Sequence, residues 1–100
     1  MNFFEIDGVP VPDEIVDVLE ESPVVRIERI VSRGQTSGWF DQSQREFVIL
    51  IAGEAELEFD GDRKVSLVRG DCLLIEPHQR HRVSRTSSDL DCFWLCVFFD

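Results

Sequence analysis

The chain has 100 residues, of which 43% are hydrophobic, and its 20 acidic and 10 basic side chains give a formal net charge of −10 at pH 7. A chain of this length forms one domain, which buries roughly two-thirds of its unfolded surface in a single core. This negative charge repels nucleic-acid phosphates and anionic lipid headgroups, so neither a nucleic acid nor a membrane surface is expected as a partner.

The N-terminal region, residues 1–23, is predicted to form an arm and one short helix. Its first residues, MNFFEIDGVPVP, lack the basic start and apolar core of a signal peptide, and nowhere do 18 apolar residues run together. In VPDEIVDVLEESP the apolar residues recur with a helical period, Asp13 and Glu14 favour a helix N-terminus, and Pro23 ends the segment. A helix of about two to three turns is unstable alone, so we expect it to dock on a sheet.

Residues 24–99 are predicted to fold as a β-barrel. In EAELEFD, acidic residues alternate with Ala55, Leu57 and Phe59, which predicts a strand with one wet face and one packed face. Gly61 can take the positive φ of a hairpin turn, and RKVSLV follows as the partner strand. Further strand-like runs are VVRIERIV, FVILIAG, CLLIE, HRVSRT and CFWLCVFF. Many short strands with little helix indicate an all-β sandwich or closed barrel, in a single domain of residues 1–100.

Two of the predicted strands, FVILIAG and CFWLCVFF, are apolar on both faces. Such strands lie inside a sandwich, under the helix or at a contact between subunits. A sheet in a chain this small cannot easily hide both faces of two strands, so we expect a homodimer that uses exposed sheet area or an edge strand.

The three cysteines, Cys72, Cys92 and Cys96, lie within apolar runs, where free thiols behave as small buried hydrophobic residues. Cys92 and Cys96 lie in one predicted strand, about 13 Å apart, which is too far for a disulfide. No helix N-terminus or adjacent histidine is evident to activate a thiol. The cysteines are therefore interpreted as packing residues, and a cytoplasmic location is expected.

Two polar residues stand at the start of apolar strands and are candidates for a site. Glu46 shares a strand face with Val48 and Leu50, and His81 shares one with Val83. A carboxylate on an apolar face requires a cation, a donor or water. The second histidine, His78, follows Pro77 and is predicted to lie in the loop before the strand.

The spacing of these residues resembles the two sequence motifs of the cupins, G-X5-H-X-H-X3,4-E-X6-G and G-X5-P-X-G-X2-H-X3-N. The positions that match the first motif are Gly34, Phe40, Gln42, Glu46 and Gly53, and those that match the second are Gly70, Glu76, His78 and His81. The resemblance covers about residues 24 to 99 and is greatest to small single-domain bacterial cupins. It implies a small jelly-roll β-barrel with its ligand site in the lumen.

The chain departs from the cupin pattern at the metal ligands. Metal-binding cupins usually supply two histidines and a glutamate from the first motif and one histidine from the second. Here the two histidine places fall on Phe40 and Gln42 with the shorter gap, or on Trp39 and Asp41 with the longer one. The ligands that the resemblance leaves are Asp41 or Gln42, Glu46 and His81.

Two interpretations of these residues stay open. One divalent metal (Zn, Fe, Mn or Ni) could be held weakly, with open positions. Alternatively, Glu46 and His81 form a metal-free hydrogen-bonded pair in the barrel mouth, with Asp41 or Arg82 nearby.

The predicted function is the binding of a small polar molecule in the barrel lumen, alongside the weak metal site. Trp39, Phe40 and Trp94 are interpreted as core or rim residues that could contact this ligand, and His78 as a residue of the rim. The alternative is a metal-dependent cupin enzyme of the isomerase or dioxygenase type, with His78 as an acid–base group.

Overall fold

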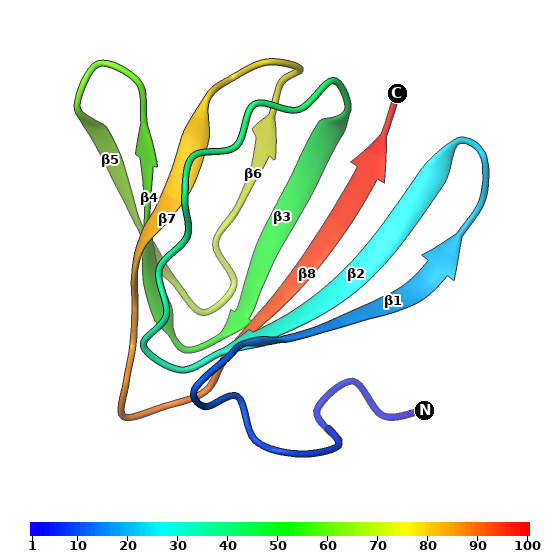
Figure 1. The fold of residues 1–100 in the computed structure, drawn as a ribbon, viewed down its shortest axis with the longest axis vertical. Coiled ribbons are helices and arrows are strands. Elements are labelled where there is room, and N and C mark those ends of the chain that lie inside the picture. The colour runs from blue at the N-terminus through cyan, green and yellow to red at the C-terminus, as the bar shows by residue number, and fades with distance from the viewer.

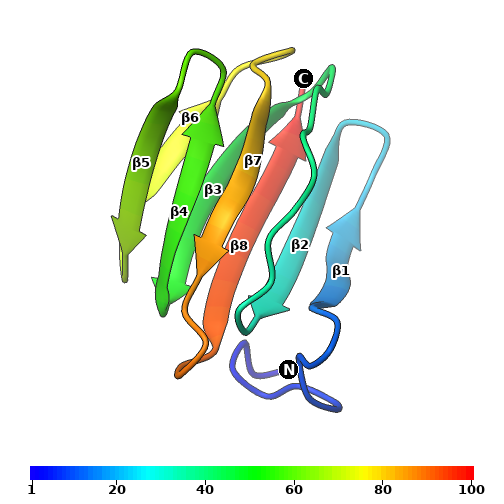
Figure 2. The same ribbon diagram turned by 60° about the vertical axis from the view of Figure 1, so that its left-hand side comes forward.

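The computed structural model describes all 100 residues as two antiparallel sheets that face each other (Figures 1 and 2). The strands are β1 (Ile15–Glu21), β2 (Val25–Ser32), β3 (Arg45–Ala52), β4 (Glu54–Phe59), β5 (Arg63–Val68), β6 (Cys72–Ile75), β7 (His81–Thr86) and β8 (Cys92–Phe99). The larger sheet has the order β1-β2-β8-β3-β6 and the smaller one β5-β4-β7. The predicted all-β jelly roll is confirmed. No helix of the length and apolarity needed to cross a membrane is present.

The predicted N-terminal helix is wrong, because residues 15–21 form strand β1. This strand pairs antiparallel with β2, with Ile15 opposite Val31. Its outer-face residues are half-buried, whereas Val16 and Val18 on the other face are exposed. The run IVDVLEE suits either a helical or a strand period, and pairing decides between them: a docked helix would leave the backbone groups along the edge of β2 without partners. The barrel therefore starts at residue 15 rather than 24.

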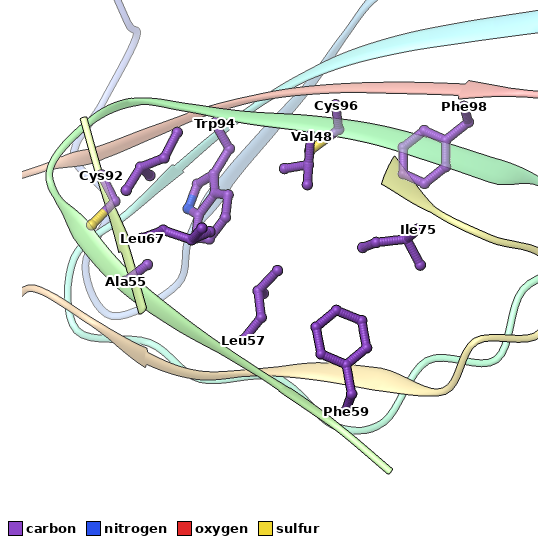
Figure 3. Close-up of a cluster of buried hydrophobic side chains, with 11 residues drawn as sticks. Val48, Ala55, Leu57, Phe59, Leu67, Ile75, Cys92, Trp94, Cys96 and Phe98 are labelled. Carbon is purple, nitrogen blue, oxygen red and sulfur yellow. The ribbon is translucent and has the colours of Figure 1, made fainter. Parts of the chain in front are cut away.

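The hydrophobic core lies between the two sheets (Figure 3). Its buried residues are Val48, Leu50, Ala55, Leu57, Phe59, Leu67, Ile75, Cys92, Trp94, Cys96 and Phe98. The predicted alternation in β4 is confirmed, since Ala55, Leu57 and Phe59 all point into this core. The β4–β5 hairpin is confirmed as well, and Gly61 in its turn has a φ of 83°.

The segment between β2 and β3, residues 33–44, runs beside β7 and extends the smaller sheet (Figure 2). The backbone N–H of Phe40 donates to the His81 carbonyl at 2.7 Å, and the N–H of His81 donates to the Phe40 carbonyl at 3.1 Å. Further along, the N–H of Ser37 donates to the Val83 carbonyl at 2.9 Å. This segment therefore places its side chains beside those of β7.

The N-terminal arm is held on the outer face of the larger sheet by Arg29. This buried guanidinium donates to the carbonyls of Phe3 and Glu5 at 3.0 and 2.9 Å, and it pairs with Asp17 at 2.7 Å. One side chain of β2 therefore ties the arm to both β1 and β2.

All three cysteines are free. Cys92 and Cys96 are buried in the same strand, as predicted, but Cys72 is exposed because it begins the edge strand β6. The predicted cytoplasmic location stays a prediction.

The outer face of the larger sheet is apolar along β3 and β8. Val97 lies between Ile27 and Phe47 on neighbouring strands, and these residues are only half-buried.

The predicted homodimer stays a prediction, which sedimentation velocity can check. If the dimer uses this face, the wild-type protein sediments as twice its 11.5 kDa chain mass and Val97→Glu as the monomer. Leu90→Glu, a change in an exposed loop, should leave the dimer intact. A monomeric wild-type protein would contradict the prediction.

Candidate functional site

A cavity of about 390 Å³ lies between the two sheets and is lined by 18 residues, 10 of them hydrophobic. Most of its lining comes from the inner faces of β2, β3, β7 and β8 and from the 33–44 segment, and β1, β4 and β6 each contribute one residue. Of the predicted site residues, those that line it are Phe40, Gln42, Glu46, His81 and Trp94. The other three, Trp39, Asp41 and His78, are not among its lining residues.

Glu46 and His81 face each other across the lumen. Glu46 lies near the start of β3, opposite Ile75 and Phe98, and His81 begins β7 opposite Phe59. Their relative exposures are 8% and 4%, and His81 Nε2 lies 3.7 Å from Glu46 Oε1. The inward orientation that the strand period predicts for both residues is confirmed.

The ring of His81 is oriented by its other nitrogen. His81 Nδ1 lies 2.8 Å from the carbonyl oxygen of Gln79, which can only accept, so Nδ1 carries the proton. In the neutral imidazole, Nε2 is therefore an acceptor. Nε2 has no hydrogen-bond partner in the protein, since Glu46 Oε1 is 3.7 Å away. Every side-chain N or O atom that is fully enclosed does have a partner, so Nε2 is not fully enclosed and opens onto the cavity.

The environment of His81 raises its pKa above 6.5. Burial is the largest single influence and lowers the pKa, because it disfavours the charged ring. The Glu46 carboxylate, which favours the protonated ring as an acceptor and as a negative charge, and the hydrogen bond to the Gln79 carbonyl together outweigh burial. Protonation of His81 is thus coupled to the carboxylate that it faces.

Two further lumenal side chains surround the Glu46 carboxylate. Gln42 Nε2 donates to Glu46 Oε1 at 3.3 Å, so Gln42 presents its amide nitrogen rather than its oxygen. Burial, then the charge of Glu46 and a hydrogen bond to it, raise the pKa of the Cys96 thiol well above its ordinary value. Cys96 is therefore a protonated thiol in the lumen, and its place there was missed. Trp94 and Cys96 are two residues apart on β8 and so lie on the same face, and this strand period could have placed Cys96 in the lumen.

Phe40 and Trp39 point in different directions from the 33–44 segment. The ring of Phe40 lines the cavity, 5.6 Å from the His81 ring between centroids. Trp39 is partly exposed, with the guanidinium groups of Arg80 and Arg82 at 4.2 and 5.0 Å from its ring centroid. Trp39 therefore packs against arginines outside the lumen.

Asp41 and His78 pair with each other at the surface. His78 Nδ1 lies 2.7 Å from Asp41 Oδ1, and both side chains are more than half exposed. The backbone N–H of His78 donates to the Gln42 carbonyl at 2.7 Å, and His78 has a positive φ of 60°. His78 lies in the loop, as predicted, where it joins that loop to the 33–44 segment.

Four charged or aromatic residues of the cavity were not predicted, namely Glu14, Arg26, Glu28 and Phe98. Arg26, Glu28 and Phe98 occupy alternate positions of β2 and β8 on the inner face, and Arg26 is opposite Phe98. The strand period could have found them, but only with the pairing of β2 and β8 known.

The lumenal donors do not fit a resident metal ion. Two metal-type donors converge, the imidazole of His81 and the carboxylate of Glu46, and no group of three or more His, Cys, Asp or Glu side chains is placed to hold a metal. Gln42 gives its amide nitrogen to Glu46, and Asp41 is paired outside. Tightly held metals in proteins usually have three or four protein ligands.

The fold and this site define a jelly-roll barrel with a small, partly polar lumen. The sequence matches the cupin domain family over residues 28–98, and the chain belongs to that family. A comparison with curated proteins found no match.

Solved structures include similar chains. One, from Ralstonia eutropha JMP134 and named a "putative mannose-6-phosphate isomerase", is 38% identical with a TM-score of 0.93, over 100% of this chain and 96% of that one. An RmlC-like cupin from Desulfovibrio desulfuricans (20% identity, TM-score 0.83, 99% and 93% covered) shares the fold. So does a cupin superfamily protein from Desulfitobacterium hafniense DCB-2 (21% identity, TM-score 0.80, 94% and 83% covered).

Proposed function

We propose that this cupin binds a small polar molecule in the barrel lumen, with Glu46 and His81 contacting its hydrogen-bond donors. The observation that carries the proposal is the exposure of His81 Nε2 to the cavity: the side chain is almost fully buried, yet this nitrogen has no hydrogen-bond partner within the protein. A polar atom buried in this way is stabilised by a partner from outside. The cavity of about 390 Å³ lies in the size range of small-molecule sites.

The two facing acceptors determine what such a molecule supplies. With Nδ1–H bound to the Gln79 carbonyl, neutral His81 presents a lone pair, and Glu46 presents a carboxylate oxygen 3.7 Å away. An amino group placed between them can donate to both, whereas a hydroxyl group, with one O–H, donates to one of them. The apolar walls then contact the rest of the molecule.

An exchangeable divalent metal is a second candidate for the same two donors. An imidazole lone pair and a carboxylate suit Zn, Fe, Mn or Ni, but two protein ligands hold such an ion weakly. Metal analysis of protein purified without a histidine tag, with His81→Ala and Glu46→Gln for comparison, measures this directly. Stoichiometric metal that is lost in both variants would favour the metal site over the metal-free pair.

An isomerase activity is the other candidate function. The similarity to the Ralstonia protein over the whole chain favours it. The acidic lining of the lumen counts against a phosphorylated substrate.

Nuclear magnetic resonance tests the proposal with the two tryptophans as reporters. Trp94 lines the cavity and Trp39 lies outside it, so a lumenal ligand should shift the Trp94 indole N–H signal and leave that of Trp39 in place. The probes are separate sets of free sugars, alkylamines and hexose phosphates.

Variants show whether the polar pair is responsible. Glu46→Gln should weaken the binding of those probes that shift the Trp94 signal, whereas Glu58→Gln should leave their binding unchanged. Glu58 is as buried as Glu46, at 8% exposure each, but pairs with Arg82 at 2.6 Å away from the cavity. If no probe set shifts Trp94 selectively, lumenal binding is refuted.

A further inference from the structure

The charged lining of the cavity is mostly acidic. Three carboxylates, Glu14, Glu28 and Glu46, line it with a single arginine, Arg26. Arg26 Nε lies 2.8 Å from Glu28 Oε2, so this guanidinium is already paired, and His81 faces Glu46. Phosphate sites use arginine, lysine or helix N-termini, and the strands here provide no helix. An anion entering the lumen therefore meets no free cationic partner.

When His81 is neutral, the polar end of the lumen presents acceptors rather than donors. His81 Nε2 in its neutral form and the Glu46 carboxylate both accept, and they point at the same space from 3.7 Å apart. The Gln42 amide nitrogen is directed at Glu46. An ammonium group supplies three N–H donors and a positive charge, so it satisfies both acceptors and the carboxylate charge together.

The aromatic rings of the cavity also suit a cation. Phe40, Trp94 and Phe98 all line it, and the face of an aromatic ring attracts positive charge. The protein already shows this arrangement with its own side chain, since the Arg26 guanidinium lies 4.4 Å from the Phe98 ring centroid while paired with Glu28. Carboxylates next to aromatic rings are the surroundings in which organic cations bind.

We infer that the lumen selects an organic ammonium compound, an amine with an apolar body, over neutral or phosphorylated molecules of the same size. The inference rests on the lumenal binding proposed above and specifies the class of ligand. The ammonium group lies between His81 and Glu46, and the body of the ligand lies against the aromatic and aliphatic walls.

Three probes with the same apolar body and different head groups test this selectivity at a pH above the raised pKa of His81, where the ring is neutral and benzylamine is still cationic. Benzylamine is cationic, benzyl alcohol neutral and benzyl phosphate anionic. Each is titrated into isotopically labelled protein, with the Trp94 indole signal as the reporter and that of Trp39 as the reference. Benzylamine should bind about tenfold more tightly than benzyl alcohol, as expected for a charge-assisted hydrogen bond. Benzyl phosphate should give no saturable shift of Trp94.

Two variants change the preference in opposite directions. Glu46→Gln should remove the roughly tenfold advantage of benzylamine over benzyl alcohol, and Glu58→Gln should retain it. Arg26→Gln frees Glu28 and the face of Phe98, so it should tighten benzylamine binding. Because Arg26 is partly exposed, this variant keeps the test decisive even if Glu46→Gln does not fold.

The outcomes separate this inference from the proposed function. If benzyl alcohol or benzyl phosphate shifts Trp94 with an affinity equal to or above that of benzylamine, the lumen is a binding site but the cation preference is wrong. An unchanged or weakened benzylamine affinity in Arg26→Gln also overturns it. If none of the three probes shifts Trp94, both the inference and lumenal binding lose their support.

Discussion

Gly53→Ala should lower the free energy of unfolding by about 2 to 5 kcal/mol, a large part of the stability of a small domain. Gly53 connects β3 to β4 with a φ of +89°, and a Cβ there would lie 2.7 Å from Cys92 Sγ and 2.8 Å from Cys92 Cα. Cys92 cannot easily move, because its thiol contacts Ser87 Oγ at 3.0 Å and the Glu54 carbonyl at 3.2 Å. Backbone strain and overpacking therefore add. Urea denaturation measures the loss.

Gly61→Ala is the matched control for this prediction. Gly61 also has a positive φ, +83°, but nothing lies within 4 Å of the position its Cβ would take. Its substitution should cost only the backbone strain, about 1 to 2 kcal/mol. Equal losses in the two variants would mean that the contact with Cys92 adds nothing.

The strand arrangement was largely predictable because its signal is local. Alternating residues mark β4, and a glycine with positive φ marks the turn after it. The helix predicted for IVDVLEE is wrong because the apolar residues of this segment suit both a helical and a strand period. What decides its structure is the unpaired edge of β2, which is a tertiary property.

The candidate site was predictable only in part. Glu46 and His81 were found because a charged residue on an apolar strand face costs free energy without a partner. The roles of Gln42 and Asp41 depend on χ angles and on the loop that contains His78, which no sequence period specifies. The place of Arg26 and Glu28 in the cavity lining could be predicted only with knowledge of which strands pair.

Glu46→Gln should move the pKa of His81 from above its ordinary value of 6.5 to below it. The carboxylate supplies a hydrogen bond and a charge that favour the protonated ring. Without it, the largest remaining influence is burial, which lowers the pKa and exceeds the opposite effect of the Gln79 carbonyl. A pH titration of the His81 ring signals measures this change. Glu58→Gln should leave the titration of His81 unchanged.

The same substitution should reverse the contribution of His81 to the pH dependence of stability. In the wild-type protein the folded-state pKa is raised, so this contribution is fully present below about pH 6.5 and is lost as the pH rises through the folded-state pKa. In Glu46→Gln the folded-state pKa is lowered. The contribution is then present above about pH 6.5 and lost as the pH falls through the folded-state pKa. Urea unfolding between about pH 5 and 8 should therefore show the free-energy difference, wild type minus variant, shrinking as the pH rises. A constant difference across this range would mean that Glu46 and His81 are not coupled, and the polar pair would then not act as one site.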